Sequence, residues 1–163
     1  MLVLVISDNH GVMNRMADVI RRVKPDLLVH LGDSQMRPDT LAEIAGCPIE
    51  AVAGNCDGSV GLPREKEIQI GSLRALIAHG DRYGVRSGSG YIRSEAERRG
   101  CQLVMYGHTH VPVLEQYPGM TVLNPGSINI PRQGDGIGTY ALIEIDSRGQ
   151  AHYTLCKYMQ SQK

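Results

Sequence analysis

The sequence predicts one α/β domain whose C-terminal third is mostly β, and three observations support this prediction. Continuous apolar runs near the N-terminus are typical of strands that are buried on both faces. Segments with helical periodicity separate these runs, which is the order of a parallel βαβ unit. Beyond residue 110 the chain consists mainly of short strand-like segments. Because no linker, repeat or low-complexity tract interrupts it, we expect residues 1–163 to form a single domain.

The first part of the chain alternates strands with helices. Residues 2–6, "LVLVI", are expected to form the first buried strand. A helix over residues 11–24 follows and ends there because proline at the next position cannot continue it. Its apolar face consists of Val12, Met16, Val19, Ile20 and Val23. Residues 27–31 then predict a second buried strand, residues 38–46 a short helix, and a third strand begins at Ile49.

The remainder is richer in strands. Residues 66–78 predict a hairpin with a Gly-Ser turn. Residues 89–100 predict a helix that opens with Ser89 as its N-cap and stops at a glycine. Residues 102–107 form the next buried strand. Four further strands are expected over residues 111–117, 120–124, 138–146 and 150–158, with a hairpin turn between the last two.

The composition is that of a globular protein without a strong electrostatic bias. Lys+Arg and Asp+Glu both number 17, which argues against nucleic acid or an acidic membrane as a partner. The four cysteines lack metal-binding or redox spacing, and we interpret them as reduced thiols of a cytoplasmic protein. The first apolar run is too short for a signal peptide or a membrane helix, so no membrane association is expected.

Polar clusters follow each of the buried strands. In open α/β sheets, ligands bind in the crevice beyond the carboxyl ends of the strands, so these side chains are expected to meet there. The clusters are "SDNH", "GD", "GNCD", "AHG" and "GHTH", which contain Asp8, His10, Asp33, Asn55, His79, His108 and His110.

These residue types together predict a metal centre. Two carboxylates, one amide oxygen and four imidazoles suit Mn²⁺, Fe, Zn²⁺ or Ni²⁺. Seven ligands exceed the needs of one ion, whereas two ions about 3.5–4 Å apart, bridged by one carboxylate, would use them all. Taken singly, each residue has an ordinary explanation as a turn, cap or loop residue. Their placement after five strands favours the metal interpretation, whereas His30 and His152 are interpreted as structural, and Asp26, Asp57 and Asp81 receive no metal role.

The order of these segments resembles the calcineurin-like metallophosphoesterase superfamily, whose signature is D-x-H, G-D, G-N-x-[DE], H and G-H-x-H. The chain length and the segment "NPGS" at 124–127 are most similar to its small YfcE-like phosphodiesterase branch. The resemblance implies a four-layer α/β/β/α sandwich with two divalent ions, Mn²⁺ being favoured over Fe, Zn or Ni. It implies that one ion is held by Asp8, His10 and His110 and the other by Asn55, His79 and His108, with Asp33 bridging. A hydroxide between the ions would attack the phosphoester, with Asp8, Asp33, Asn55 and His108 as the catalytic residues.

One position departs from the pattern. Many superfamily members carry a histidine after the ligand asparagine, as a proton donor to the leaving group, whereas this chain has Cys56. A neutral thiol is a weaker general acid, which suggests a preference for good leaving groups or an acid supplied elsewhere. Asp81 stands where relatives often have a second histidine. Asn124 and Arg132 are expected to line the substrate mouth with Cys56, although turn formation is an equal explanation for their segments.

Three functions remain to be compared. A metal-dependent phosphodiesterase acting on a small phosphoester is favoured, and a phosphomonoesterase with the same site is its alternative. The retromer scaffold subunit shares the fold that the resemblance implies, so a protein-binding module is a further alternative. Such a module would not need an intact ligand set. A nuclease is disfavoured by the neutral charge. The sequence leaves a homo-oligomer open.

Overall fold

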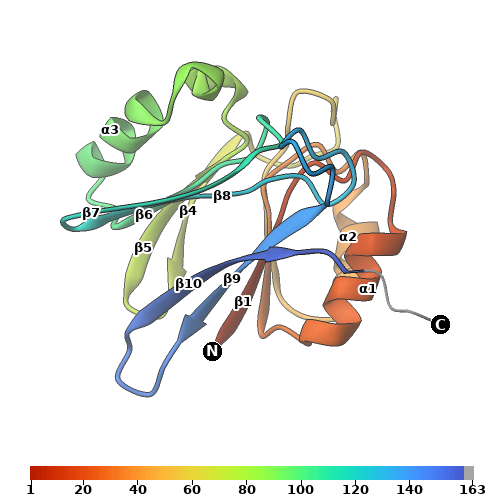
Figure 1. Ribbon diagram of the computed structural model, residues 1–163, viewed down its shortest axis with the longest axis horizontal. Coiled ribbons are helices and arrows are strands. Elements are labelled where there is room, and N and C mark those ends of the chain that lie inside the picture. The colour runs from red at the N-terminus through yellow and green to blue at the C-terminus, as the bar shows by residue number, and fades with distance from the viewer. Residues whose placement is uncertain (160–163) are drawn as a thin grey trace.

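Two five-stranded sheets face each other in the computed structural model, which describes residues 1–159 (Figure 1). The first sheet has the order β10-β9-β1-β2-β3. Its strands are β1 (Leu2–Ile6), β2 (Leu27–His30), β3 (Ile49–Ala51), β9 (Thr139–Ile145) and β10 (Ala151–Lys157). The second sheet has the order β4-β5-β6-β8-β7. Its strands are β4 (Glu65–Ile70), β5 (Leu73–Ala78), β6 (Leu103–Met105), β7 (Pro112–Tyr117) and β8 (Met120–Pro125).

Helices cover the outer faces of both sheets. The first sheet is covered by α1 (Asn14–Val23) and α2 (Pro38–Ala45), and the second by α3 (Gly90–Arg98) (Figure 1). Two short 3₁₀ turns, η1 (Asp81–Tyr83) and η2 (Val85–Ser87), precede α3. The four-layer α/β/β/α sandwich is therefore confirmed. Each helix within the described part of the chain falls short of what a membrane crossing requires in length and apolar character.

Strand β1 shows why its sequence is continuously apolar. Val3 and Val5 belong to the core between the two sheets, whereas Leu4 and Ile6 pack against the helices. Successive side chains of a strand point to opposite faces, so a strand that is covered on both sides needs apolar residues throughout. Strands β1, β2 and β3 pair in parallel, and so do β5, β6 and β8. The predicted βαβ arrangement is confirmed.

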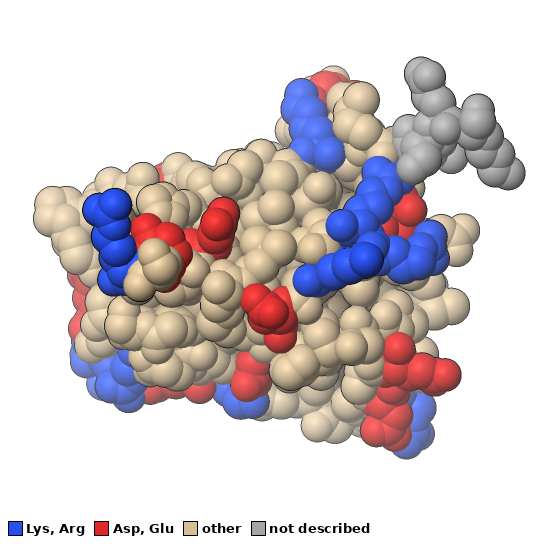
Figure 2. Space-filling model, turned by 90° about the horizontal axis from the view of Figure 1, so that it is seen from below, with Lys and Arg blue, Asp and Glu red and all other residues tan. Residues whose placement is uncertain are grey.

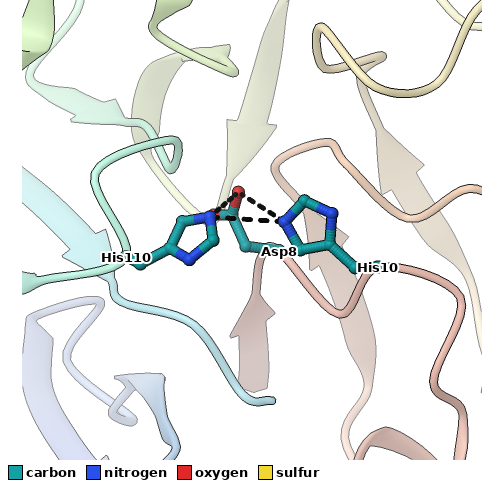
Figure 3. Close-up of side chains that lie close together, drawn as sticks. All are labelled: Asp8, His10 and His110. Carbon is teal, nitrogen blue, oxygen red and sulfur yellow. Dashed lines mark hydrogen bonds and ion pairs between the residues drawn. The ribbon is translucent and has the colours of Figure 1, made fainter. Parts of the chain in front are cut away.

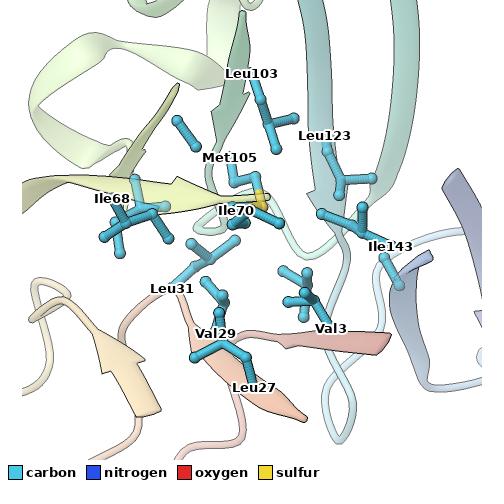
Figure 4. Packing of buried hydrophobic residues seen from close by; sticks show 14 of the residues in the cluster. Val3, Leu27, Val29, Leu31, Ile68, Ile70, Leu103, Met105, Leu123 and Ile143 are labelled. Atoms are coloured by element: carbon cyan, nitrogen blue, oxygen red, sulfur yellow. The ribbon is translucent and has the colours of Figure 1, made fainter. Parts of the chain in front are cut away.

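The core between the sheets is built almost entirely from aliphatic side chains. Val29 and Leu31 of the first sheet meet Ile70, Met105 and Leu123 of the second (Figure 4). The chain contains no Phe or Trp, so branched residues and methionine fill the space between the sheets. This packing holds the two sheets in a fixed relation, and with them the strand ends that carry the polar clusters.

Two details differ from the sequence prediction. Helix α1 begins at Asn14, and Val12 precedes it with 47% of its surface exposed, so Val12 is not part of the buried helical face. The carbonyl of Val12 instead accepts hydrogen bonds from Asn9 and Asn129, which fixes it in the loop before the helix. Ser89 does precede α3, but its hydroxyl donates to Glu115 (2.8 Å) and makes no capping bond to the helix.

The inter-sheet core gives a direct stability test. Leu123→Ala removes a fully buried side chain from the core between the sheets, and we expect it to lower the free energy of unfolding by about 2–5 kcal/mol. Urea unfolding followed by circular dichroism measures the change. Leu114→Ala, at a partly buried position on the rim of the same core, is the control and should cost clearly less. Equal losses would mean that the core is not centred between the sheets.

Candidate metal centre

The polar clusters converge at one edge, where the carboxyl ends of the parallel strands of both sheets meet. Asp8 follows β1, and its carboxylate Oδ2 accepts a hydrogen bond from the backbone N–H of His108, which follows β6 (3.0 Å). The N–H of Gly107 donates to the carbonyl of His79, which follows β5 (3.0 Å). The Asp8–His108 bond thus joins the first sheet to the second, and the Gly107–His79 bond joins two site segments of the second sheet.

The backbone of these segments is unusual. A left-handed conformation is rare for residues other than glycine, and holding one costs of order 1–3 kcal/mol. Five of the seven predicted ligands adopt it with φ between 47° and 66°, namely Asp8, His10, Asp33, His108 and His110. Such conformations persist only where the surrounding structure enforces them, and they concentrate at functional sites.

Glycine is required at two of the strand ends because backbone and carboxylate approach closely. A Cβ at Gly54 would lie 2.1 Å from Asp33 Oδ1, and one at Gly107 would lie 2.0 Å from Ser7 Oγ and 2.7 Å from Asp8 Oδ2. No real Cβ tolerates these distances. Glycine is therefore needed in "GN" and "GH" because a side chain there would collide with the site carboxylates or their neighbours.

One group of candidate ligands consists of Asp8, His10 and His110 (Figure 3). His110 Nε2 lies 3.2 Å and His10 Nε2 3.9 Å from Asp8 Oδ1. The two Nε2 atoms are 3.3 Å apart. Asp8 is completely buried, and its Oδ1 has no hydrogen-bond partner within the described chain. Leaving a buried carboxylate oxygen unpaired is costly, so this group suits a cation placed among the three side chains.

A second group consists of Asp8, Asp33 and His79. His79 Nε2 lies 3.4 Å from Asp33 Oδ2 and 3.9 Å from Asp8 Oδ1. This nitrogen is also buried without a hydrogen-bond partner among the described residues. Asp33 Oδ2 is at the same time 3.9 Å from His10 Nε2, so one carboxylate oxygen lies between the two groups. That is where a bridging ligand would be placed.

The imidazoles are oriented by the backbone. His79 Nδ1 lies 2.7 Å from the carbonyl oxygen of Leu31, and His110 Nδ1 lies 2.7 Å from that of Ile130. A carbonyl only accepts hydrogen bonds, so Nδ1 of each ring carries the proton and, in the neutral ring, Nε2 presents a lone pair. Lone pairs and carboxylate oxygens that face one another favour a cation between them. The residues therefore fit a metal ion.

The ionisation of the carboxylates agrees with this arrangement. Burial opposes it, yet His110 and His79 hold the pKa of Asp8 below its usual value. Burial is likewise outweighed at Asp33, where His79 and the N–H of Cys56 hold the pKa well below the ordinary range. At His79 the two carboxylates overcome burial and raise the pKa of the imidazole. The centre thus carries buried negative charge that attracts a cation.

Two predicted ligands lie at the outer side of the centre. Asn55 is exposed, and its Nδ2 lies 3.3 Å from Cys56 Sγ. The ring of His108 stands edge-on to that of His79, with centroids 5.1 Å apart. Burial, and then the neighbouring His79, lower the pKa of His108, which favours the neutral form of its ring. His108 belongs to neither group above, and the metal roles of both residues stay predictions.

Asp57 supports the centre in a way that the sequence prediction missed. Its carboxylate accepts hydrogen bonds from the backbone N–H groups of Asp33 (2.7 Å), Gly54 (2.7 Å) and Gln35 (2.5 Å). The side chain thereby ties the loop after β2 to the loop after β3. The signal in the sequence was its place two residues after Asn55, where an aspartate commonly bonds nearby backbone.

Ser127 is a second missed residue. It is fully buried, and its hydroxyl donates to the carbonyl of Asp8 (2.8 Å) while accepting from the N–H of Ile130 (2.8 Å). Because the carbonyl of Ile130 orients His110, one hydroxyl connects two members of the first group. The segment "NPGS" at 124–127 therefore supports the centre through the hydrogen bonds of Ser127.

Asn124 differs from its expected role at the substrate mouth. It is fully buried, and its Nδ2 donates to the carbonyl of Gly107 and to Thr109 Oγ1 (both 3.0 Å). Its Oδ1 accepts from the N–H of Gly126 (2.8 Å). These bonds use both ends of the amide to hold the "GHTH" loop. Arg132 does border the centre, since its N–H donates to the carbonyl of His110 (3.1 Å).

Comparison with known proteins agrees with this geometry. The model of the calcineurin-like phosphoesterase superfamily domain matches residues 1–148. The chain is 33% identical over 134 residues to the probable metallophosphoesterase YsnB of Bacillus subtilis, covering 81% of this chain and 78% of that protein. It is 35% identical over 144 residues to a probable metallophosphoesterase of Methanothermobacter thermautotrophicus, covering 83% and 81%. A predicted phosphoesterase from Streptococcus pneumoniae superposes with a TM-score of 0.80 at 28% identity, covering 96% and 97%.

Two further likenesses bear on the choice of function. The phosphodiesterase YfcE of Escherichia coli is 28% identical over 104 residues, which is 59% of this chain and 52% of that protein. The zinc complex of Vps29 from Entamoeba histolytica has a TM-score of 0.76 at 20% identity and covers 98% of this chain and all of its own. The second likeness concerns the fold alone.

The close approach at Gly107 can be tested. Gly107→Ala would push a methyl group against Ser7 and Asp8, and we expect it to weaken the binding of divalent metal ions and to destabilise the fold by about 1–3 kcal/mol. Isothermal titration calorimetry and thermal unfolding measure the two effects. Gly90→Ala is the control, because a Cβ there meets nothing within 4 Å. Unchanged Mn²⁺ binding in Gly107→Ala would contradict the packing described.

Ser127 gives a second test. Ser127→Ala leaves the carbonyl of Asp8 and the N–H of Ile130 without their partner, and we expect a 10- to 100-fold loss of affinity for one bound ion, roughly the range seen for outer-shell changes. Calorimetric titration with Mn²⁺ resolves the affected site. Ser72→Ala, at an exposed turn position, should leave both affinities unchanged. Equal metal affinities in the two variants would show that Ser127 does not support the centre.

Proposed function

The chain belongs to the calcineurin-like phosphoesterase superfamily, and from this premise we propose that it is a phosphodiesterase that works with a pair of divalent metal ions. The observation that carries the proposal is the pair of buried, unpartnered atoms Asp8 Oδ1 and His79 Nε2, which lie 3.9 Å apart, with Asp33 Oδ2 3.4 Å from His79 Nε2. Buried polar atoms in folded proteins are normally paired. A metal ion bound among them would satisfy both atoms.

The proposed ligand sets follow the two groups. One ion is held by Asp8, His10 and His110, and the other by Asn55, His79 and His108, with Asp33 shared. The placing of Asp33 Oδ2 at 3.9 Å from His10 Nε2 and 3.4 Å from His79 Nε2 supports the sharing. Mn²⁺ is the proposed ion because carboxylate, amide and imidazole donors suit it, and Fe, Zn²⁺ and Ni²⁺ are the alternatives.

The chain's own residues prepare the site for a phosphoester. When bound, the ions lower the pKa of water and offset negative charge on the phosphoryl oxygens. Asp8 and Asp33 stay ionised at neutral pH because their pKa values are held low. Asn55 is exposed and His108 half-buried, so these two face the incoming substrate. The proposed catalytic set is accordingly Asp8, Asp33, Asn55 and His108.

Cys56 points to the type of substrate. Burial and the neighbouring carboxylate of Asp33 raise the pKa of its thiol to about 11. The thiol therefore keeps its proton at neutral pH but gives it up reluctantly, which makes it a poor general acid. We propose that the enzyme prefers phosphodiesters with acidic alcohols, such as aryl alcohols, as leaving groups.

The charge of the protein favours a small substrate over nucleic acid. Lys+Arg and Asp+Glu balance at 17 each. On the face in Figure 2, acidic and basic side chains lie scattered among uncharged ones, apart from one group of Lys and Arg beside the end of the described chain. A nuclease would need an extended positive path for the backbone. We further propose that residues 1–163 act as one unit in the cytoplasm, where the free thiols of all four cysteines would persist.

A protein-binding scaffold and a phosphomonoesterase are the competing functions. The scaffold has fold likeness to Vps29 in its favour, at 20% identity. The Vps29 structure is itself a zinc complex, so unpartnered buried ligand atoms agree with both functions, and metal-dependent turnover is what separates them. The phosphomonoesterase would use the same centre, and only substrate comparison separates it.

The test is a metal-dependence assay on two substrate classes. Metal-free protein should be inactive, and Mn²⁺ should restore hydrolysis of bis(p-nitrophenyl) phosphate with little hydrolysis of p-nitrophenyl phosphate. Asp33→Asn should lower kcat by about 100-fold or more because it removes the shared carboxylate. Asp39→Asn, an exposed aspartate of α2, is the control and should behave as the unaltered protein. Absence of metal-dependent turnover on both substrates would refute the enzyme and favour the scaffold.

A further inference from the structure

Cys56 is placed differently from the other cysteines. Its Sγ, a ring nitrogen of His10 and a carboxylate oxygen of Asp33 all lie within 4.8 Å of one another. Cys56 is also exposed, so this group opens to solvent. Within the described residues, the remaining cysteines, Cys47, Cys101 and Cys156, belong to no such group.

The position of Cys56 is fixed by the centre itself. Its backbone N–H donates to Asp33 Oδ1 (2.7 Å), which leaves Oδ2 turned toward His10 and His79. The N–H of Gly54 is held in turn by Asp57 (2.7 Å). The loop that carries the thiol is therefore anchored at both ends, and the thiol cannot move far from the carboxylate.

The group offers three different donors. An imidazole nitrogen, a carboxylate oxygen and a sulfur form a softer set than the oxygen and nitrogen ligands elsewhere in the centre. Thiolates select Zn²⁺ and Cd²⁺, and Co²⁺ follows zinc in such sites, whereas Mn²⁺ prefers oxygen. His10 and Asp33 also belong to the groups that contain the buried, unpartnered Asp8 Oδ1 and His79 Nε2, so a cation that satisfies those atoms would lie beside this group.

We propose that Cys56 is a conditional metal ligand, whose sulfur joins His10 and Asp33 around a thiophilic ion such as Zn²⁺, Cd²⁺ or Co²⁺ but stays unbound beside Mn²⁺. This inference rests on the proposed function, because it uses the same centre. The sulfur–metal bond forms as the thiol proton passes to water, and no electrons are transferred.

The consequence is a centre that responds to the identity of its ion. With Mn²⁺, the side of the centre that faces Cys56 would stay open to water or substrate. With a thiophilic ion, the sulfur would occupy that side, so the ion would be held more tightly and hydrolysis would be slower. A histidine at position 56 would not discriminate in this way, because imidazole is a ligand for both kinds of ion.

Cobalt spectroscopy tests the proposal directly. Metal-free full-length protein is titrated with Co²⁺, which gives visible d–d bands on binding and a near-ultraviolet charge-transfer band when sulfur is a ligand. The unaltered protein should show both, Cys56→Ser should keep the visible bands and lose the near-ultraviolet band, and Cys101→Ser should match the unaltered protein. Visible bands without the near-ultraviolet band in the unaltered protein, or an unchanged band in Cys56→Ser, would overturn the proposal. Absence of all cobalt bands would overturn the metal centre itself.

Competition between ions gives the second measurement. Cys56→Ser should lower the affinity for Cd²⁺ by about 10-fold or more, while the affinity for Mn²⁺ changes less than about threefold. Zn²⁺ should inhibit the Mn²⁺-loaded unaltered protein more strongly than the Mn²⁺-loaded variant. An equal loss of Cd²⁺ and Mn²⁺ affinity would show that residue 56 only supports the loop, and the conditional-ligand proposal would be wrong.

Discussion

Two buried carboxylates face imidazole nitrogens in a group that concentrates negative charge. The rings of His79 and His110 give their Nδ1 protons to backbone carbonyls, and the pKa values of Asp8 and Asp33 are held low. Positive charge inside such a group, as a proton on Nε2 or as a metal ion, stabilises it. This single constraint explains why the strand ends are built as they are, because the backbone must bring the acceptors together before any ion arrives.

Building these strand ends costs conformational free energy, and packing elsewhere in the fold offsets it. Left-handed backbone at Asp8, Asp33 and His110 is unfavourable by itself, and glycine at 54 and 107 loses more backbone freedom on folding than other residues do. The aliphatic core between the sheets and the helices on both outer faces hold these segments in place. Hydrogen bonds from Asp57 and Ser127 then fix the loops individually. A rigid scaffold carrying strained ligand loops is what precise ion placement requires.

Those parts of the structure that depend on periodicity were readable in the sequence, and those that depend on loop geometry were not. The apolar pattern predicted β1, β2 and the hairpin of β4 and β5. The rule that ligands bind beyond the carboxyl ends of strands predicted that Asp8, Asp33 and His79 lie close together. Val12 fitted the helical period but lies outside α1, because Asn9 and Asn129 hold its carbonyl in the preceding loop. Such side chain–backbone bonds have no period, so the roles of Ser127 and Asn124 could not be derived from the sequence, and only the short spacing from Asn55 marked Asp57.

The departure at position 56 can now be understood from the backbone. The N–H of residue 56 holds Asp33 Oδ1, and an N–H is present whatever side chain the residue carries. The shared carboxylate is therefore positioned independently of whether residue 56 is histidine or cysteine. A change at this position leaves the metal-ligand geometry intact and alters only the group that faces the outer side of the centre. With histidine, that group can protonate a leaving alcohol, whereas with Cys56 it is a weak acid and a soft donor. On the proposed function, a thiol in place of a histidine would narrow the range of leaving groups and widen the response to different ions, because both properties depend on the side chain at position 56 while the backbone beneath it stays the same.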